Sequence, residues 1–580
     1  MKPKVAILGG GVGGLSTAHY LADSCDVTVY EASDHAVGGK AKSVRNADGT
    51  PAEHGFRYFP GYYEYVPGIM EQIPFGRRSV ADHLVEAEVT QILRDGQAPV
   101  PLANKVARGF LDGAHTMGQL LELGIPIEEL AVFGAKILTL AATGPKRWDN
   151  QYDALSWWDF TEAEGKSPEY QAYLADGMNL ATVAARGTDL STRTVGRTLI
   201  RLLFAYAKGR QGMDRVLDGP TSDAWIEPWR TELVRRGVRF DMGAWLERLE
   251  MGPDGIRAAV IRQGGERRRI EADYFVAAVP VEAMAAVADD ALVEAAPSLG
   301  RIGELQTRWM NGIQFYLRTP VPSAPGHSVY VGSGAALTSI SQAQFWPKAD
   351  LGQVGGEPVR GVISAIVSNF EHCCPQHGGR PLTHHTRAEL SACTWETVKA
   401  FVGADDHQRL SDGDLLGSSL DRALVETAGG RLHNLEPLLI NRPGDLERRP
   451  DPCTEIPNLS IAADYATTST DLACMEGAAE AAFLSARRIA MWADVSFDHP
   501  VRSLDPAELA DVWSADDERY SRGEATLVTE EMLLALARFS RRERIVSLVR
   551  NGVSRMRPTE VRSSIARRSR SDRAWSALRG

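Results

Sequence analysis

Long apolar runs are absent from this chain of 580 residues. None reaches the roughly 18 apolar residues that a helix needs to cross a bilayer, so we expect no transmembrane helix. Lys2 and Lys4 precede the apolar stretch Val5–Leu15, which mimics a secretory signal. The five glycines within Gly9–Gly14 fit a tight phosphate-binding turn better, so we expect this segment to stay uncleaved.

Cysteine is scarce, with six residues and no regular spacing. A secreted protein held together by disulfides would carry more, so we expect a cytoplasmic protein. The segment His372–His377 combines two histidines with two adjacent cysteines. Adjacent cysteines suit tetrahedral zinc poorly and no second ligand pair follows, so we expect a loop and no metal site.

Lysine is missing from the C-terminal stretch Arg538–Gly580, where 13 arginines accompany three acidic residues. The whole chain has a formal net charge of −11, so the body before this stretch is strongly acidic. Because an acidic body repels nucleic acid, we expect no nucleic-acid partner. The basic tail indicates contact with an acidic partner or an anionic membrane, peripherally on its inner face. The competing interpretation, which the poor segregation of apolar and basic residues favours, is a helix packed on the body followed by a disordered Arg/Ser segment.

The length suggests two to four structural units. Apolar spacing predicts a strand at Lys4–Leu8, a helix at Gly14–Asp23 and a second strand at Asp26–Tyr30. Residues 100–235 are mostly helical in pattern, and strand patterns return further along the chain. Those strands are predicted at Val238–Phe240, Ala258–Ile261, Tyr274–Val279, Gln314–Leu317, Val362–Val367 and Leu459–Ala462.

A glycine-rich turn follows the first predicted strand. Gly9, Gly11 and Gly14 give the spacing G-x-G-x-x-G, and Val12 and Gly13 lie between the last two. Residues without a side chain let the backbone approach a pyrophosphate, and the next helix offers its N-terminal N–H groups to that charge. Glu31 closes the second strand, where a carboxylate can accept hydrogen bonds from an adenosine ribose. Together these features predict a dinucleotide-binding domain.

A second glycine motif, Gly38-Gly39-Lys40, follows Glu31-Ala32. This spacing resembles that of the FAD-binding amine oxidase and carotenoid desaturase superfamily, in which an arginine usually stands in place of Lys40. Lysine keeps the positive charge but lacks the fork of arginine, which weakens bidentate phosphate contact.

Near the other end, Pro457–Tyr465 and Asp471–Ala478 resemble the C-terminal FAD motif of the same superfamily, within its phytoene desaturase-like branch. The resemblance implies that Asp464 hydrogen-bonds the ribityl or phosphate region. It also implies that the backbone at Met475 and Ala478, opening a helix, faces the flavin and stabilises charge on the reduced ring. Ala463 replaces a glycine that the family commonly has.

Three further stretches carry the same resemblance, which spans roughly residues 1–495. Glu53–Tyr63 resembles the segment that lies along the isoalloxazine ring. Leu246 resembles the position that contacts adenine, and Val279 resembles the end of the strand that returns to the cofactor domain. The residues of the first stretch expected at the flavin are Gly55, Phe56, Arg57 and Tyr58.

The implied fold is α/β: a Rossmann-like FAD-binding domain of the glutathione reductase type, interleaved with a sheet-and-helix substrate domain and followed by a helical extension. We expect FAD-binding parts at residues 1–100, 236–290 and 441–495. Residues 101–235 form a mostly helical substrate- or membrane-facing region, residues 291–440 the substrate domain with its sheet, and residues 496–580 the extension.

The chemistry implied is FAD-dependent desaturation of a hydrophobic isoprenoid or acyl chain by hydride transfer to flavin N5, which needs an apolar tunnel more than a catalytic triad. Arg57 is a candidate polar group beside the reacting carbons, and its alternative is a tether to phosphate or backbone. No general base stands out. The runner-up is amine oxidation, but Asn311 stands where amine oxidases usually have a lysine.

A third hypothesis is a non-catalytic escort protein for prenylated partners, which would lack an intact FAD site. Both cofactor motifs survive here, so we expect an enzyme with non-covalently bound FAD; Cys474 is the one residue placed to attach it covalently. The small hydrophobic substrate is expected to enter through the helical region. The substrate's identity, the electron acceptor and the oligomeric state stay open.

Overall fold

The structure is a computed structural model that describes residues 1–103, 122–183, 185–207, 214–321, 325–374, 378–402 and 410–526. The basic stretch Arg538–Gly580 therefore lies outside the described residues. Within the described ranges, no helix has the length and apolar character that crossing a membrane requires. No cluster of metal-ligating side chains occurs in them either.

A five-stranded parallel sheet joins segments from the beginning, middle and end of the chain. Its order is β12 (Arg239–Met242), β2 (Asp26–Glu31), β1 (Lys4–Leu8), β16 (Tyr274–Ala277) and β30 (Leu459–Ile461). The central strand β1 buries Val5, Ala6, Ile7 and Leu8, so both of its faces lie in the core. Burial on both faces is typical of a parallel sheet covered on two sides.

The two sides of this sheet are covered by different elements. One side carries α1 (Val12–Leu21), α14 (Met475–Trp492) and α10 (Glu227–Arg235). The other carries the sheet β13 (Trp245–Gly252), β14 (Gly255–Gln263), β15 (Glu266–Ile270) with α11 (Val281–Val287) and α12 (Asp290–Ala295). This arrangement confirms the predicted α/β fold with a Rossmann-like cofactor-binding domain.

A second, seven-stranded sheet forms the substrate domain. Its order is β10 (Val100–Ala103), β9 (Val89–Arg94), β19 (Gly326–Val331), β20 (Thr338–Ser341), β23 (Gly361–Val367), β18 (Asn311–Leu317) and β26 (Leu415–Leu420). The helix α13 (Arg387–Val402) packs on one face through Trp395 and Val398. Because β9 and β10 belong to this sheet, the segment 89–100, which we assigned to the cofactor domain, lies in the substrate domain.

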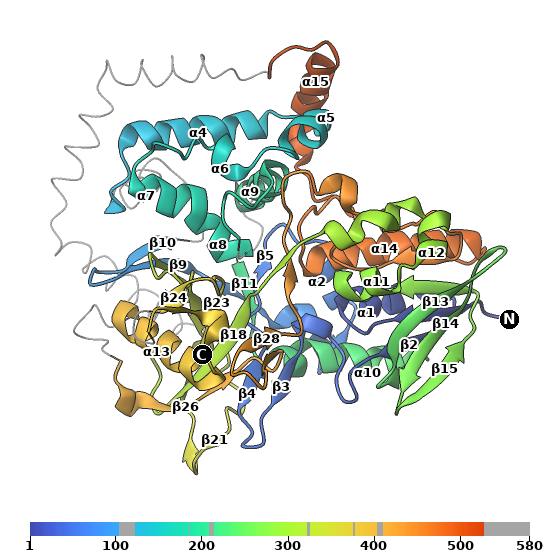
Figure 1. The fold of residues 1–580 in the computed structure, drawn as a ribbon, viewed down its shortest axis with the longest axis horizontal. Coiled ribbons are helices and arrows are strands. Elements are labelled where there is room, and N and C mark those ends of the chain that lie inside the picture. Colours follow the sequence, from blue (N-terminus) through green and yellow to red (C-terminus); the bar gives the residue numbers. More distant parts are fainter. Residues whose placement is uncertain are drawn as a thin grey trace, which may run out of the picture.

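The helical region contains α4 (Ile127–Ala141), α5 (Pro145–Arg147), α6 (Trp157–Phe160), α7 (Pro168–Tyr170), α8 (Met178–Val183) and α9 (Thr192–Ala207). Most of these helices lie together at the upper left of Figure 1, beside the second sheet. The segment after α9 differs, because Trp225, Trp229 and Leu233 pack into the core around β1 and β2. Its packing places this segment with the cofactor domain, earlier than the boundary at residue 236 that we expected.

Short elements complete the described fold. A three-stranded sheet contains β5 (Phe59–Pro60), β11 (Asp214–Leu217) and β8 (Leu84–Ala87), and the helix α2 (Tyr65–Met70) packs against α14. Two-stranded pairs are β3 (Ser43–Arg45) with β4 (Pro51–Glu53), β6 (Pro74–Phe75) with β7 (Arg78–Ser79), β17 (Thr307–Arg308) with β29 (Leu438–Leu439), β21 (Gln353–Val354) with β22 (Glu357–Pro358), β24 (Cys373–Cys374) with β25 (Arg380–Pro381), and β27 (Leu424–Glu426) with β28 (Leu432–Asn434).

The extension begins as a helix packed on the body. In α15 (Ala510–Ser521) the Asp516 carboxylate accepts two hydrogen bonds from Arg147 of α5, at 3.0 and 3.1 Å, and a third from the backbone N–H of Gly144. Asp516 is fully buried. The extension is thus held by a paired buried charge up to residue 526.

One disulfide joins Cys374 and Cys393, although the cysteine spacing predicted no such pair. It ties β24 to α13 on the substrate domain. The other four cysteines are free, and Cys373 is exposed beside the bridge.

Candidate cofactor and active site

The glycine-rich turn brings backbone atoms into contacts that exclude side chains. A Cβ added to Gly9, whose φ is +111°, would lie 2.3 Å from the carbonyl oxygen of Ala278. A Cβ added to Gly13 would lie 1.8 Å from the carbonyl oxygen of Ala462. Gly11 is different, because a Cβ there would meet only the Cα of Gly39, at 3.8 Å. The space next to Gly11 is therefore open, with only Gly39 beside it.

The two glycine motifs lie together at this turn. The backbone N–H of Gly38 donates to the Gly10 oxygen at 2.7 Å, and Gly11 and Gly38 form a parallel bridge. The Glu31 carboxylate accepts hydrogen bonds from the backbone N–H groups of Gly10 at 2.7 Å and Ser33 at 2.8 Å. Burial raises the pKa of Glu31 above its ordinary value. The structure thus brings together the residues that sequence spacing assigned to this half of the site.

Arg57 and Lys40 connect the expected ring-lining segment to the second glycine motif. The Arg57 guanidinium donates to the backbone oxygens of Gly55, at 2.9 Å, and of Lys40. The Lys40 ammonium donates to the backbone oxygen of Pro437. Burial lowers the pKa of Arg57, and the carboxylates of Glu53 and Asp421 oppose that effect. These contacts are the ones that the backbone-tethering alternative for Arg57 requires.

The second half of the site is the N-terminus of α14, which starts at Met475. Cys474 precedes it, and no described side chain caps this helix end. The Glu476 carboxylate accepts three hydrogen bonds, at 2.6 to 2.9 Å, from the backbone N–H groups of Glu64, Tyr65 and Val66. The segment from Gly55 to Val66 thus reaches from the glycine turn to the N-terminus of α14.

The remaining predicted residues lie around this frame. Asp464 is partly buried directly after β30, Ala463 is buried beside it, and Ala478 is buried in the first turn of α14. Leu246 lies in β13, Val279 just after β16, and Ala32 just after β2. Phe56 is buried and its ring centroid lies 5.1 Å from that of His327, which also contacts Tyr58.

These residues fit FAD. The turn leaves a gap at Gly11 where a phosphate can approach, Glu31 is positioned for a ribose, and α14 presents uncapped N–H groups at the far end. Burial raises the pKa of the Cys474 thiol to about 12, so the thiol stays protonated and a poor nucleophile. Non-covalent attachment of the cofactor stays a prediction.

A buried polar network lies beside the segment that starts at Gly55. The Asp421 carboxylate accepts hydrogen bonds from His54 Nδ1 at 2.8 Å and from the Asn311 amide at 2.6 Å. The Asn434 amide donates to the Asn311 oxygen at 3.0 Å. Sequence reasoning singled out Asn311 but missed Asp421 and Asn434, since nothing in their local sequence marks them.

Buried arginines of α9 form a second network that the sequence did not reveal. Asp471, in the loop before α14, pairs with Arg193 and with Arg449, the latter at 2.8 Å. Arg201 donates to Asp505 at 2.6 Å and to the backbone oxygen of Thr470 at 3.0 Å. These pairs fasten the helical region to the loop that leads into α14.

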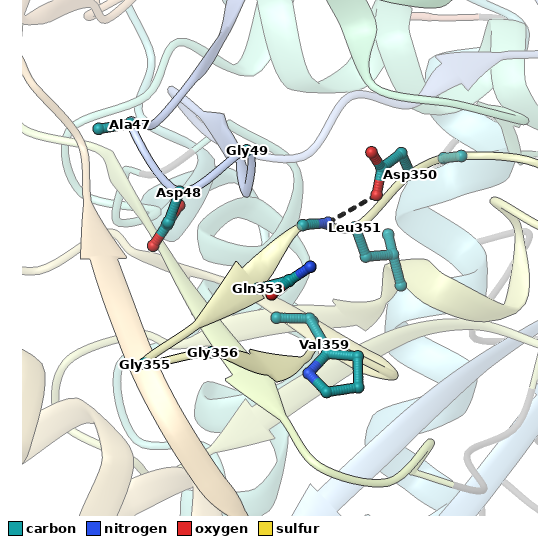
Figure 2. Close-up of a pocket in the computed structure, with 12 residues that line it drawn as sticks. Ala47, Asp48, Gly49, Asp350, Leu351, Gln353, Gly355, Gly356 and Val359 are labelled. Carbon is teal, nitrogen blue, oxygen red and sulfur yellow. Dashed lines mark hydrogen bonds between the residues drawn. The ribbon is translucent and has the colours of Figure 1, made fainter.

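A surface recess of about 680 Å³ lies elsewhere, between the turn at Asp48 and the β21–β22 hairpin. Figure 2 shows its lining, in which Asp48, Asp350 and Gln353 are the main polar side chains. None of the cofactor-site residues lines it. It is therefore separate from the cofactor site.

The fold and the site define an FAD-dependent oxidoreductase. The sequence profile of the family described as "Flavin containing amine oxidoreductase" matches residues 12–416, and the chain belongs to this family. Membership confirms the predicted enzyme class and the FAD cofactor, and it leaves the escort hypothesis without support.

Among curated proteins, the chain is similar to the 15-cis-phytoene desaturase of Synechococcus elongatus, with 24% identity over 510 residues. That alignment covers 84% of this chain and 95% of the relative. Tryptophan 2-monooxygenase of Agrobacterium tumefaciens is 37% identical, but only over 120 residues, which are 19% of this chain and 16% of the relative.

Solved structures share the fold. Cyclohexylamine oxidase from Brevibacterium oxydans has a TM-score of 0.58 at 14% identity, covering 85% of this chain and 100% of that one. Putrescine oxidase with bound putrescine has a TM-score of 0.57 at 12% identity, covering 85% and 99%. At such identities these likenesses show the fold alone.

Replacing Gly11 with valine is expected to abolish FAD retention while the protein still folds. The new side chain would project into the open space beside Gly39 and so occupy the place of the pyrophosphate, without touching the protein core. The measurement is the ratio of flavin to protein absorbance, together with circular dichroism. Full flavin occupancy in Gly11→Val would contradict this assignment. Gly13→Ala is the contrasting variant, expected to fail at folding because of the Ala462 oxygen.

Two neighbouring buried acids are expected to act on stability with opposite sign. Burial opposes ionisation of Asp471, but Arg193, Arg449 and Arg197 hold its pKa below the ordinary value. Its carboxylate therefore stabilises the fold above about pH 4, and that contribution is lost as the pH falls through the folded-state pKa. Asp471→Asn should lower the unfolding free energy at pH 7 by roughly 3–5 kcal/mol, and less in acid.

Asp153 is the matched control, because burial and the Asp471 charge raise its pKa to about 6. Its ionisation destabilises the fold above that pH, so Asp153→Asn should raise the unfolding free energy at pH 7 to 8 and leave it unchanged below about pH 4. Denaturant titrations at several pH values measure both effects. If Asp471→Asn and Asp153→Asn changed the unfolding free energy at pH 7 in the same direction, this prediction would be wrong.

Proposed function

We propose that this enzyme removes hydrogen across a C–C bond of a long hydrophobic isoprenoid or acyl chain. The cyanobacterial phytoene desaturase aligns with 84% of this chain and 95% of its own length, which supports the proposal over the whole enzyme. When bound, FAD supplies the two-electron oxidation by accepting a hydride. The protein's part is to position the substrate, exclude water and receive the remaining proton.

The observation that carries the proposal is the position of Asn311 at the start of β18. This strand contains no lysine, and the Asn311 amide is committed to Asp421 and Asn434. The two lysines near the site, Lys40 and Lys42, pair with the Pro437 oxygen and with Glu436. A lysine that holds water beside the flavin, as amine oxidases usually have, is therefore missing from this strand.

Tyrosines near the site favour an apolar substrate. Tyr58, Tyr62 and Tyr63 lie in the segment that leads to α14, and burial raises the pKa of each well above its ordinary value. Neutral aromatic rings of this kind suit contact with a hydrocarbon chain. Entry of the substrate through the helical region, residues 101–235, belongs to this proposal.

Amine oxidation is the competing function, since the family carries its name and two structures of the same fold are amine oxidases. We expect 15-cis-phytoene in liposomes to bleach the flavin under anaerobic conditions. Cyclohexylamine and putrescine should bleach it at least 100-fold more slowly. Stopped-flow absorbance of the flavin measures both rates. Rapid bleaching by the amines, with none by phytoene, would establish the competing function.

We further propose that the basic stretch Arg538–Gly580 holds the protein peripherally on the inner face of an anionic membrane, where an apolar substrate would be dissolved. A chain ended after residue 526 keeps α15 and its Arg147–Asp516 pair, so it should stay folded and retain FAD. Flotation with phosphatidylglycerol liposomes should recover the full chain and not the shortened one, and recovery should fall as salt rises. Equal recovery of both chains would remove this role.

A further inference from the structure

His54 is a buried histidine whose two ring nitrogens differ in surroundings. Its side chain is 8% exposed, and Nδ1 lies 2.8 Å from the Asp421 carboxylate. Nε2 is fully buried and has no hydrogen-bond partner among the described residues. Buried polar atoms are normally paired, so the hydrogen-bonding capacity of Nε2 stays unused by the described residues.

The network around His54 sets which nitrogen holds the proton. Asp421 also accepts hydrogen bonds from the Asn311 amide at 2.6 Å and from the backbone N–H of Ala423 at 3.0 Å. These bonds fix the carboxylate in place. With Nδ1–H donating to it, neutral His54 keeps the lone pair of Nε2 available as a proton acceptor.

Two carboxylates, those of Asp421 and Glu436, face the His54 ring. Asp421 is held ionised, because its hydrogen bonds with His54 and Asn311 outweigh the effect of burial and keep its pKa below the ordinary value. Glu436 lies 3.7 Å from Nδ1 and is itself paired with Lys42 at 3.1 Å. The nearby cation Arg57 is directed to the oxygens of Gly55 and Lys40. One ionised carboxylate thus contacts the ring directly.

The chain around His54 places it beside the cofactor site. Its backbone oxygen accepts a hydrogen bond from Gly312 at 2.7 Å, and a Cβ on Gly312 would lie 2.8 Å from the Cα of Gly55. His54 therefore sits between the start of β18 and the segment that reaches from the glycine turn to the N-terminus of α14.

We infer that His54 is the general base of this enzyme and that its Nε2 receives the proton released when the substrate is oxidised. One substrate hydrogen would leave as a hydride, with the electron pair of its C–H bond, to the flavin that supplies the oxidation when bound. The neighbouring C–H bond breaks with its electrons forming the new double bond, and its proton goes to Nε2. The substrate loses two electrons, the flavin gains two, and the Asp421 carboxylate stabilises the imidazolium. This proton transfer from the substrate to Nε2 rests on the proposed desaturation.

A second histidine, His327, is the competitor. Its Nδ1 lies 3.3 Å from Asp214, and its Nε2 is also buried without a described partner. The longer distance to the carboxylate makes it the weaker candidate. A third pair, His83 with Asp218 at 2.9 Å, is partly exposed and serves as the matched control.

The experiment measures the midpoint potential of the bound FAD between pH 5.5 and 8.5, by anaerobic titration with dithionite and a reference dye, in the absence of substrate. The variants are His54→Gln, His327→Gln and His83→Gln. If His54 takes up a proton as electrons reach the flavin, the wild-type potential should gain about 30 mV per pH unit of extra slope across its titration. That extra slope should vanish in His54→Gln and persist in the other two.

The same proteins are then mixed with 15-cis-phytoene in liposomes. His54→Gln should keep its FAD but reduce it 10²–10⁴-fold more slowly, as expected for loss of a general base. One outcome separates the two proposals: the slope of the midpoint potential against pH depends on His54, but phytoene does not reduce the flavin. That outcome would refute the proposed substrate and leave His54 as the proton acceptor. Where His54→Gln does not fold, Asp421→Asn replaces it and should reduce the extra slope, because the imidazolium loses its carboxylate partner. An unchanged slope in these variants, or its loss in His327→Gln, would overturn the inference.

Discussion

The close approach of α1 to β30 governs the cofactor domain. Gly13, in the first turn of α1, lies so near the Ala462 carbonyl that no side chain fits between them. This contact brings the N-terminal turn against a segment about 450 residues later in the chain, and it lets α1 and α14 pack side by side (Figure 1). The two helix N-termini that flank the FAD site therefore come from opposite ends of the sequence.

Between those ends, the segment from Glu53 to Val66 is held by polar groups rather than by regular structure. Glu53 accepts a hydrogen bond from the backbone of Thr221, Arg57 anchors to the Lys40 oxygen, and Glu476 binds three successive N–H groups near Tyr65. Burying these charged groups costs desolvation free energy, and their hydrogen bonds hold the backbone in one position beside the cofactor. It also explains why so many ionisable groups with shifted pKa values gather here.

The helical region and the extension depend on paired buried charges. Arg193 and Arg201 of α9 meet Asp471 and Asp505, and Arg147 meets Asp516 of α15. Removing one partner of such a pair leaves an uncompensated charge, so these contacts fix geometry strongly even where their net stabilisation is small. The helix α9 is thereby tied to the loop that leads into α14, and α5 is tied to α15.

The sequence by itself determined the cofactor, the enzyme class and the fold of the domain that binds FAD. Glycines at fixed spacing, such as Gly9, Gly11 and Gly14 within a short strand–turn–helix, indicate a dinucleotide-binding domain, because phosphate binding needs them there. FAD and the enzyme class came from the resemblance of the second glycine motif and of the C-terminal motif to a known family. Only the tertiary structure decided that His54 meets Asp421 and Asn311, which lie 367 and 257 positions further along the chain. It likewise decided that β9 joins the substrate sheet. Such contacts depend on how distant strands pair and pack, and local residue spacing carries no record of that.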